Sequence, residues 1–394
     1  MSFFKELVQL LKRNIRDYGM YIALFVIMVF FSISTDGIFI SSRNISNLIN
    51  QMGYIAVLAI GMTLVIVIRH IDLSVGYLAG FLGAIAAIAL TSWGLPVWIV
   101  IPLVLVFGAI AGLISGTMVA KFGIPSFVAT LAGWLIYRGA LLQATLRTGT
   151  IIIPNDFFNA IGNGYIPDLP IPGFLPDLHK LTLLFGIAAI ALMVVSEIRS
   201  RKNKMAYDFE VLSKNIFILR IIFTVILLGV ITYILAGYNG LSWTALIVLV
   251  VTLIYNFITT QTILGRHIYA VGGNPEAAEL SGISVNKITY VVFGSMGMLT
   301  GLSGMLFASR LQSATTTAGQ GFELDAIAAA YVGGVSAAGG VGKVAGSLIG
   351  ALVMISLTNG MNLMGIDIST QYIVRGAVLV AAVVFDVATR KQRA

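Results

Sequence analysis

The side chains that could do chemistry in this chain are few, and they are scattered through apolar sequence. Asp72, Glu323 and Asp325 stand beside long apolar runs, and Arg138 stands inside one. The closest approach to a phosphate-binding loop, residues 337–344, lacks the first glycine and the final hydroxyl. With three widely spaced histidines and no cysteine, the sequence offers no metal-binding cluster. We therefore predict no catalytic residue, no metal site and no enzyme.

Charged side chains near apolar runs are also candidates for lining a path through a membrane, because an intramembrane charge is costly and persists for function. By the predicted boundaries, Asp72, Glu323 and Asp325 sit near helix ends that water can reach. Asp72 either gates a path near Ser74 or caps the helix that follows, and we favour the cap. Glu323 and Asp325 either line the mouth of a path or complement a positive helix end. The candidate path residues are Asp72, Ser74, Trp134, Arg138, Glu323, Asp325 and Asn359.

One polar loop between apolar runs carries a clear helix signal. Asn274 is a good N-cap, Pro275 suits the first helical position, and Glu276 places negative charge at the positive helix end. Gly282 can take the left-handed conformation that ends a helix. The result is a helix of about two turns, roughly 11 Å long. Such a helix could dock into a groove of a partner, although local physics equally allows an ordinary loop with a helical turn.

The composition predicts the elements that position these residues. Of 394 residues, 58% are hydrophobic and 10% charged, against about 25% charged in soluble domains. We expect an all-α polytopic membrane protein with one transmembrane domain over 1–394. The net charge of +8 does not indicate nucleic acid, because the basic residues lie in short loops and report orientation.

We expect about twelve transmembrane helices, each of about 20 residues. They lie near 18–35, 50–68, 73–91, 97–117, 125–146, 181–196, 217–236, 242–262, 288–308, 324–340, 344–360 and 370–387. The first is read as an uncleaved crossing and not as a signal peptide. The weakest is 324–340, which could instead be re-entrant. With twelve crossings, 17 Lys and Arg lie on the side of the N-terminus and 4 on the other, against 13 and 8 if 324–340 does not cross. The positive-inside rule therefore favours twelve crossings with both termini cytoplasmic.

Two loops stand out between these crossings. The loop at about 147–180 holds five of the nine prolines and is too irregular for lipid, so it faces water or a protein partner. The loop 197–216 is the most basic stretch, and we favour anchoring beside anionic lipid over a specific binding role.

Several separated motifs resemble one family. The run 265–285, GRHIYAVGGNPEAAELSGISV, resembles the cytoplasmic coupling segment of permease subunits of ABC importers for monosaccharides, the ribose, galactose and xylose group. The resemblance covers about 40–146 and 242–390. It includes matches at 71–76, 125–133, 321–329, 332–334 and 339–342. The additional helix pair at about 181–236 makes the sequence most similar to the xylose-type members.

This resemblance implies the fold and the partners of an ABC importer permease. Such permeases work as homodimers in the bacterial cytoplasmic (inner) membrane, with a cytoplasmic ABC ATPase on one side and an extracytoplasmic sugar-binding protein on the other. No cofactor is expected on this chain, since ATP and Mg belong to the ATPase. The expected cargo is a monosaccharide, xylose or a related sugar, and the binding protein supplies the selectivity.

The resemblance also implies a docking element within a coupling loop at about 263–287. Glu276 and Glu279 would contact basic residues of the ATPase. The implied coupling residues are Gly265, Arg266, Gly272, Gly273, Asn274, Pro275, Glu276, Ala277, Ala278, Glu279, Ser281 and Gly282.

For three path candidates a packing role competes with a contact to sugar. Trp134 could stack on a sugar ring, but aromatic residues in membrane helices more often pack or lie at the interface. Arg138, expected to be buried, is favoured as a tether to backbone carbonyls. Asn359 could face the path or bind a neighbouring helix.

Two other functions are weighed against this one. A secondary sugar carrier or facilitator also fits twelve crossings. The sequence, however, lacks the carboxylates deep within helices that such carriers usually keep, and this function leaves the capped helix unexplained. A lipid-linked transferase would need a cluster of acids or a metal site, and the sequence shows neither.

Overall fold

The computed structural model describes residues 15–171, 173, 175–209, 211 and 213–391, and these are almost entirely helical. Their contacts group into two compact units. The first is built mainly from residues 165–242, and the second from 16–39, 48–164 and 243–391.

The first unit is an antiparallel pair of long helices, α8 (Lys180–Ala206) and α9 (Lys214–Ala236). They pack closely where Gly186 faces Thr232, and Arg220 forms a 2.6 Å ion pair with Glu197. The expected helix pair is therefore present. Much of the basic stretch 197–216 is not loop, because α8 continues to Ala206.

The second unit holds all the other helices and the small sheet. Its long helices are α2 (Ile15–Ser34), α3 (Ser42–Val67), α4 (Val75–Thr91), α5 (Val97–Ala120), α6 (Ser126–Thr145), α10 (Trp243–Gln261), α13 (Val285–Leu311), α15 (Val344–Leu363) and α16 (Ile368–Lys391). Its shorter helices are η1 (Ile38–Ile40), α7 (Asp156–Asn163), α11 (Ile263–Gly273), α12 (Pro275–Leu280) and α14 (Phe322–Val332). Strands β1 (Thr150–Ile152) and β2 (Ser313–Thr315) pair antiparallel, with Ile151 opposite Ala314.

The described helices confirm an all-α polytopic membrane protein. Nine of them are long and apolar enough to cross a bilayer, and α2 and α4 are shorter apolar helices. Eleven of the twelve expected crossings coincide with a helix of this set. The basic residues expected at 1–14 and at 393 lie outside the described part of the chain.

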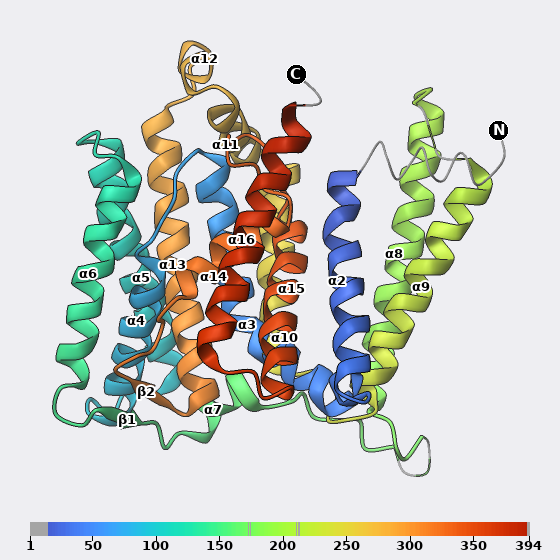
Figure 1. The fold of residues 1–394 in the computed structure, drawn as a ribbon, viewed down its shortest axis with the longest axis horizontal. Helices are drawn as coiled ribbons and strands as arrows, with labels where there is room; N and C mark the ends of the chain where they lie inside the picture. The colour runs from blue at the N-terminus through green and yellow to red at the C-terminus, as the bar shows by residue number, and fades with distance from the viewer. Residues whose placement is uncertain (1–14, 172, 174, 210, 212, 392–394) are drawn as a thin grey trace. The chain divides into compact units, whose positions relative to one another are not determined.

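The twelfth expected crossing, 324–340, differs in form from the prediction. Helix α14 has 11 residues, about 16 Å, against a hydrocarbon core of about 30 Å. Gly334, Gly339 and Gly340 have positive φ angles of 87°, 80° and 70°, which end the helix and fold the chain into a turn. In Figure 1 the chain between β2 and α15 still passes from one end of the unit to the other, partly as extended backbone.

The crossing that contains α4 is also interrupted, and its chain runs in the direction opposite to that of α14. After α3 ends at Val67, residues 68–74 return into the body of the unit as non-helical chain before α4 begins. The first turns of α4 and α14 meet there, with Gly76 packed against the Gly319 carbonyl and the Glu323 side chain. Two helices of opposite direction thus start side by side inside the protein (Figure 1).

Glycines let α5 and α13 approach closely. Gly108 and Gly112 of α5 face the backbone of α13 at Gly297, and Gly301 faces Val104. A side chain at any of these positions would collide with backbone atoms. Close approach through small residues is the usual way that membrane helices associate, because lipid provides no hydrophobic drive between helices.

Two helices on the side away from α12 begin at ordered caps. Asn155 accepts a 2.9 Å hydrogen bond from the Phe158 amide at the start of α7. Before α16, the Ser369 hydroxyl and the Thr370 amide donate to Asp367 and lower the pKa of that carboxyl to about 2.

We expect Gly297→Ala to destabilise the protein and Gly139→Ala to leave it unchanged or slightly more stable. The methyl at 297 meets the Gly108 carbonyl and the Gly112 amide, whereas the methyl at 139 enters open space. Overpacking costs about 1–3 kcal/mol, and Ala is better than Gly in a helix by up to about 1 kcal/mol. The apparent melting temperature in detergent measures both. Equal melting temperatures for the two variants would contradict the close packing of α5 on α13.

Candidate coupling and translocation site

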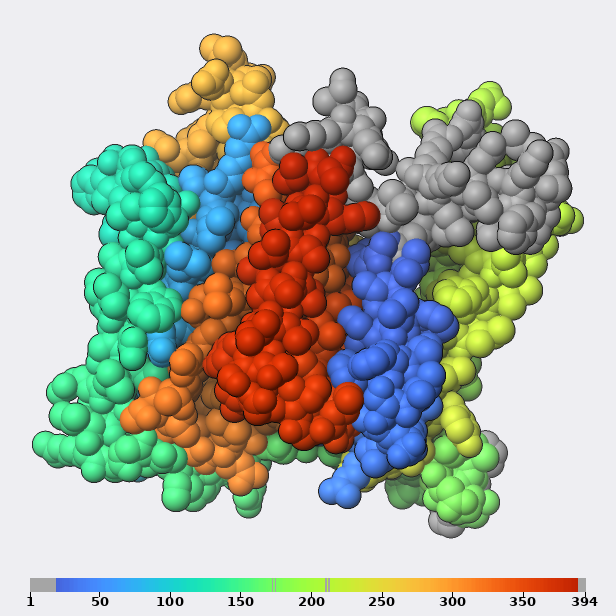
Figure 2. Space-filling model, viewed as in Figure 1, coloured from blue at the N-terminus to red at the C-terminus, as the bar shows by residue number. Residues whose placement is uncertain are grey.

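The predicted helix in the loop after α10 is present as α12. The Asn274 side chain accepts a 3.1 Å hydrogen bond from the Ala277 amide, Pro275 is the first helical residue, and Gly282 has φ 83°. The helix ends at Leu280, one residue before the predicted end. It projects beyond the neighbouring helices of its unit, as Figures 1 and 2 show.

The exposed surface of α12 combines acids with one large apolar residue. Glu276 and Glu279 are exposed, and Ala278 is buried. Leu280 is 91% exposed, which is unusual for a leucine in an ordered helix. Sequence reasoning missed it, although its place at the end of a polar helix was a usable signal.

The other predicted coupling residues divide into exposed and structural positions. Arg266, Gly273, Ala277, Ser281 and Gly282 are exposed. Gly265 and Gly272 are buried because backbone passes directly over them, at Ile258 and Thr259 for Gly265 and at Val67 for Gly272. These two glycines therefore position the loop and cannot themselves touch a partner.

Arg69, absent from the predicted set, ties the loop to the transmembrane body. Its Nε donates to the Gly272 carbonyl at 2.7 Å, and its terminal nitrogen also donates to the Gly273 carbonyl. Arg69 itself has a φ of 65°, a left-handed conformation that costs a residue with a side chain about 1–2 kcal/mol. The two charged hydrogen bonds offset that cost, since each contributes about 1.5–3 kcal/mol.

The glycine turn after α14 joins the same network. The Gly340 amide donates to the Val67 carbonyl at 2.8 Å, and the Tyr269 hydroxyl donates to the Gly342 carbonyl at 2.6 Å. The loop that carries α12, the end of α3 and the turn before α15 thus form one hydrogen-bonded unit. We call it the coupling network: Val67, Arg69, Tyr269, Gly272, Gly273, Gly340 and Gly342.

From the coupling network, residues 70–74 lead to the start of α4. The Thr130 hydroxyl of α6 donates to the Ile71 carbonyl at 3.3 Å. The Asp72 carboxylate, 2% exposed, accepts from the Ser74 amide at 2.9 Å and from the Ser74 hydroxyl at 2.6 Å. These bonds close the turn before α4, but they are not a helix cap: the N-cap of α4 is Ser74, and in the described part of the chain Asp72 accepts from no amide inside the helix. The favoured capping role of Asp72 is therefore not found.

The structure brings six of the seven predicted path residues to the place where α4 and α14 begin, around α6. Glu323 accepts a 3.0 Å hydrogen bond from the Trp134 indole. Asp325 forms an ion pair with Arg375 of α16, with Nε 2.9 Å from Oδ1. Gly133, next to Trp134, packs on Ser74. Asn359 lies on α15, where its neighbour Gly360 faces Phe31 of α2.

Two expectations about these residues are wrong. Asp72 and Glu323 do stand near helix ends, but they are 2% and 6% exposed, because both helices start inside the protein. Arg138 is not buried: it is exposed on α6 and lies over the rings of Trp134 and Tyr77, 5.5 and 5.7 Å from their centroids. The expected tether to backbone carbonyls is not found among the described residues.

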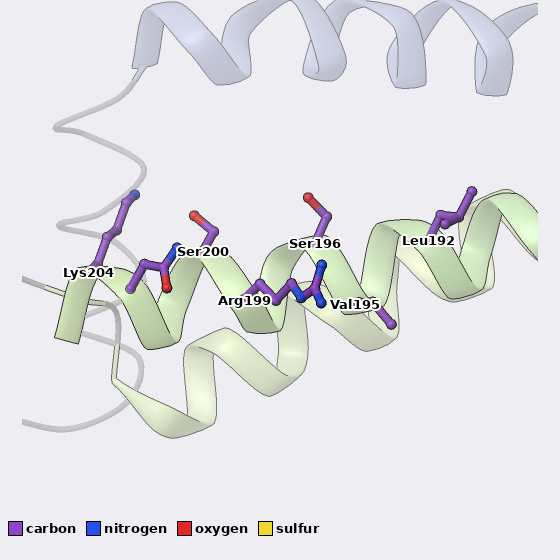
Figure 3. A pocket seen from close by; sticks show the side chains of 7 residues that line it. Leu192, Val195, Ser196, Arg199, Ser200 and Lys204 are labelled. Carbon is purple, nitrogen blue, oxygen red and sulfur yellow. The ribbon is translucent and has the colours of Figure 1, made fainter. Parts of the chain in front are cut away.

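A separate hollow of about 530 Å³ lies along α8 in the first unit. Leu192, Ser196, Ser200 and Lys204 follow one face of the helix at four-residue spacing, with Arg199 beside them (Figure 3). Among the residues that the structure describes, α8 alone lines the hollow, whose lining passes from apolar to basic. This gradient suits a helix end at a lipid headgroup layer.

Comparison with known proteins places the chain in a family. The family model described as the permease component of a branched-chain amino acid transport system matches residues 44–383. The chain belongs to this permease family.

Three curated relatives resemble the permease over nearly their whole length. The xylose transport system permease protein XylH of Haemophilus influenzae is 42% identical over 96% of this chain and 98% of its own. XylH of Escherichia coli is 40% identical over 96% and 93%. The ribose import permease protein RbsC of Haemophilus influenzae is 36% identical over 93% and 91%. No solved structure matches the chain.

We expect Arg69→Gln to loosen the coupling network and Arg266→Gln, an exposed arginine of the same loop, to leave it intact. Loss of the bonds to Gly272 and Gly273 frees the loop from the end of α3. A loss of 1.4 kcal/mol in the free energy of local opening is a tenfold change in its equilibrium constant, so the hydrogen-bonded amides of Gly339 and Gly340 should exchange hydrogen at least tenfold faster in Arg69→Gln. Mass spectrometry of the purified permease measures the exchange. Unchanged protection in Arg69→Gln would show that the network does not depend on this residue.

Proposed function

We propose that this chain is the membrane-spanning permease subunit of a binding-protein-dependent ABC importer, and that it carries a monosaccharide into the cytoplasm. Xylose or a related sugar is the proposed cargo, since relatives named as xylose permeases resemble the chain over nearly its whole length. The energy comes from a separate ATPase subunit with its own ATP and Mg, because the sequence of this chain holds no phosphate-binding loop. The protein is proposed to work as a homodimer.

The observation that carries the proposal is the coupling network beneath α12. A partner that moves α12 would also move the end of α3 and the glycine turn, since hydrogen bonds join all three. Those two segments lead to the interrupted crossings that meet at Glu323. Docking on α12 is therefore able to shift the crossings as a rigid body, the kind of change by which an ATPase could open a path.

The proposed orientation places α12 and both termini in the cytoplasm. In Figure 1, α2 begins and α16 ends toward the same side of the second unit as α12. The positive-inside rule assigns that side to the cytoplasm. The sugar-binding protein would then meet the opposite side, where α7 and the β1–β2 pair lie.

We expect Glu276→Lys to reduce ATPase stimulation and sugar uptake while the permease stays in the membrane. The reversal puts a cation where the ATPase is proposed to present basic residues, and a like-charge contact at an interface costs several kcal/mol. Asp208→Lys, the same charge reversal in the exposed loop between α8 and α9, is the matched control. Uptake and ATP hydrolysis in proteoliposomes with the ATPase and the binding protein measure both variants.

Normal uptake by Glu276→Lys, with assembly intact, would remove the docking assignment. Leu280→Ala is a second test of the docking assignment. It removes the most exposed apolar side chain of α12 and changes no charge. We expect it to weaken ATPase binding without changing its salt dependence. Uptake by the permease alone, in vesicles without ATPase, would instead favour a secondary carrier.

A further inference from the structure

Arg138 is a cation at mid-height on a membrane helix, with no hydrogen-bonding partner among the described residues. It is residue 13 of the 20 in α6, and its side chain lies back over Trp134, one turn nearer the helix start. Side chains on a helix tilt in this direction. Trp134 is roughly 12 Å from the first residue of α6 and 16 Å from the last at 1.5 Å per residue. The guanidinium is therefore held close to the middle of the helix.

The neighbours of Arg138 leave its hydrogen-bond donors free. Within the part of the chain that the structure describes, Arg138 has ring contacts to Trp134 and Tyr77 and no hydrogen bond or ion pair. A guanidinium carries five N–H donors, and acyl chains accept none of them. Helix α6 packs on α4 and α5 and is exposed on its remaining face. Water, a polar solute or a second copy of the chain would satisfy these donors on that face.

An unpaired acceptor lies on the other side of Trp134. The Trp134 indole donates to Oε1 of Glu323, whereas Oε2 has no hydrogen-bond partner although the residue is only 6% exposed. Buried carboxylate oxygens are rarely left unpaired. Tyr77 meets Trp134 edge to face at 4.8 Å, so the rings hold the cation and the acid in fixed places.

This set of groups has a definite chemistry. Arg138 and Glu323 supply a cation and an anion on one aromatic scaffold, so this set of groups has no net charge with which it could select an ion. They supply N–H donors from Arg138 and the Oε2 acceptor of Glu323, which lies against Gly76 until α4 and α14 move apart, and together these suit hydroxyl groups that both donate and accept. Aromatic rings offer apolar area to the C–H faces of a sugar ring. The complement is a neutral polyhydroxy molecule.

We propose that Arg138, Trp134, Tyr77 and Glu323 form a transient monosaccharide-binding subsite inside the membrane, reached along the exposed face of α6. The proposal rests on the proposed function and names the residues that touch the sugar during its passage. Arg138 hydrogen-bonds the sugar from a water-filled path, and Glu323 accepts from it when α4 and α14 move apart.

Because the chain contains no cysteine, single-cysteine labelling tests the subsite directly. Arg138→Cys is compared with Ile136→Cys, a 65% exposed neighbour on the same helix, in vesicles that hold the full chain. A positively charged, water-soluble thiosulfonate reagent should label position 138 at least tenfold faster than 136. Leu135→Cys, a 60% exposed position three residues before Arg138, keeps the guanidinium in place, and saturating xylose should slow its labelling at least threefold, while the same concentration of glycine betaine should not.

Equal, slow labelling at both positions would overturn the proposal, because Arg138 would then face lipid or closed protein. A spontaneous disulfide between two copies of Arg138→Cys would also overturn it, because that face would then be a contact between copies. Labelling of Leu135→Cys that is fast but indifferent to xylose would show a wet surface without a sugar site and would overturn the binding claim.

A transport assay gives the second readout. In the assembled complex, Arg138→Gln should lower maximal uptake at least tenfold and leave unchanged the half-saturating concentration of sugar-loaded binding protein. Arg199→Gln, an exposed arginine of α8, should transport normally. Full uptake by Arg138→Gln would overturn the subsite. Wild-type uptake that needs no ATPase would instead overturn the proposed function, and the labelling would still report on the subsite.

Discussion

A backbone that leaves its helix inside a membrane must find hydrogen-bond partners within the protein, since lipid offers none. Two crossings of this permease are interrupted in this way, at 68–74 and 333–343. They satisfy part of that demand through each other and through the loop below them: Gly340 donates to Val67, and Arg69 donates to Gly272 and Gly273. The same bonds that make the interruptions tolerable also join them to α12.

In the proposed mechanism, the docking helix and a polar centre lie at two ends of the same segments. The docking helix is α12, with exposed Glu276, Glu279 and Leu280. The polar centre is the meeting of α4 with α14, where Glu323 bonds Trp134. Close glycine contacts along α5 and α13 are proposed to act as a rigid frame, so that a displacement of α12 would pass to the interrupted crossings.

Local signals were enough to predict most of the fold, and tertiary contacts explain the rest. Long apolar runs and the cap at Asn274 predicted the helices and α12, because both depend on residues close in sequence. For the interruption after α14, the sequence indicated only that 324–340 was the weakest crossing. A hydropathy average over many residues does not detect the glycines that turn the chain. The sequence alone shows Arg69 only as one of the basic loop residues, because the groups that it contacts lie about 200 residues away. The exposure of Arg138 depends on which helices cover α6, which no local pattern reports.

The central claim is that α12 and the glycine turn before α15 move together when the ATPase closes. In this cysteine-free chain, spin labels at Ser281, directly after α12, and at Val341, both exposed, measure it by pulsed electron resonance through the ATP cycle. A second pair, Ser281 with Phe122 beyond α5, reports on movement against the frame. We expect the Ser281–Val341 distance to stay constant while the Ser281–Phe122 distance changes. A change between Ser281 and Val341, with Val341 fixed relative to Phe122, would contradict the claim.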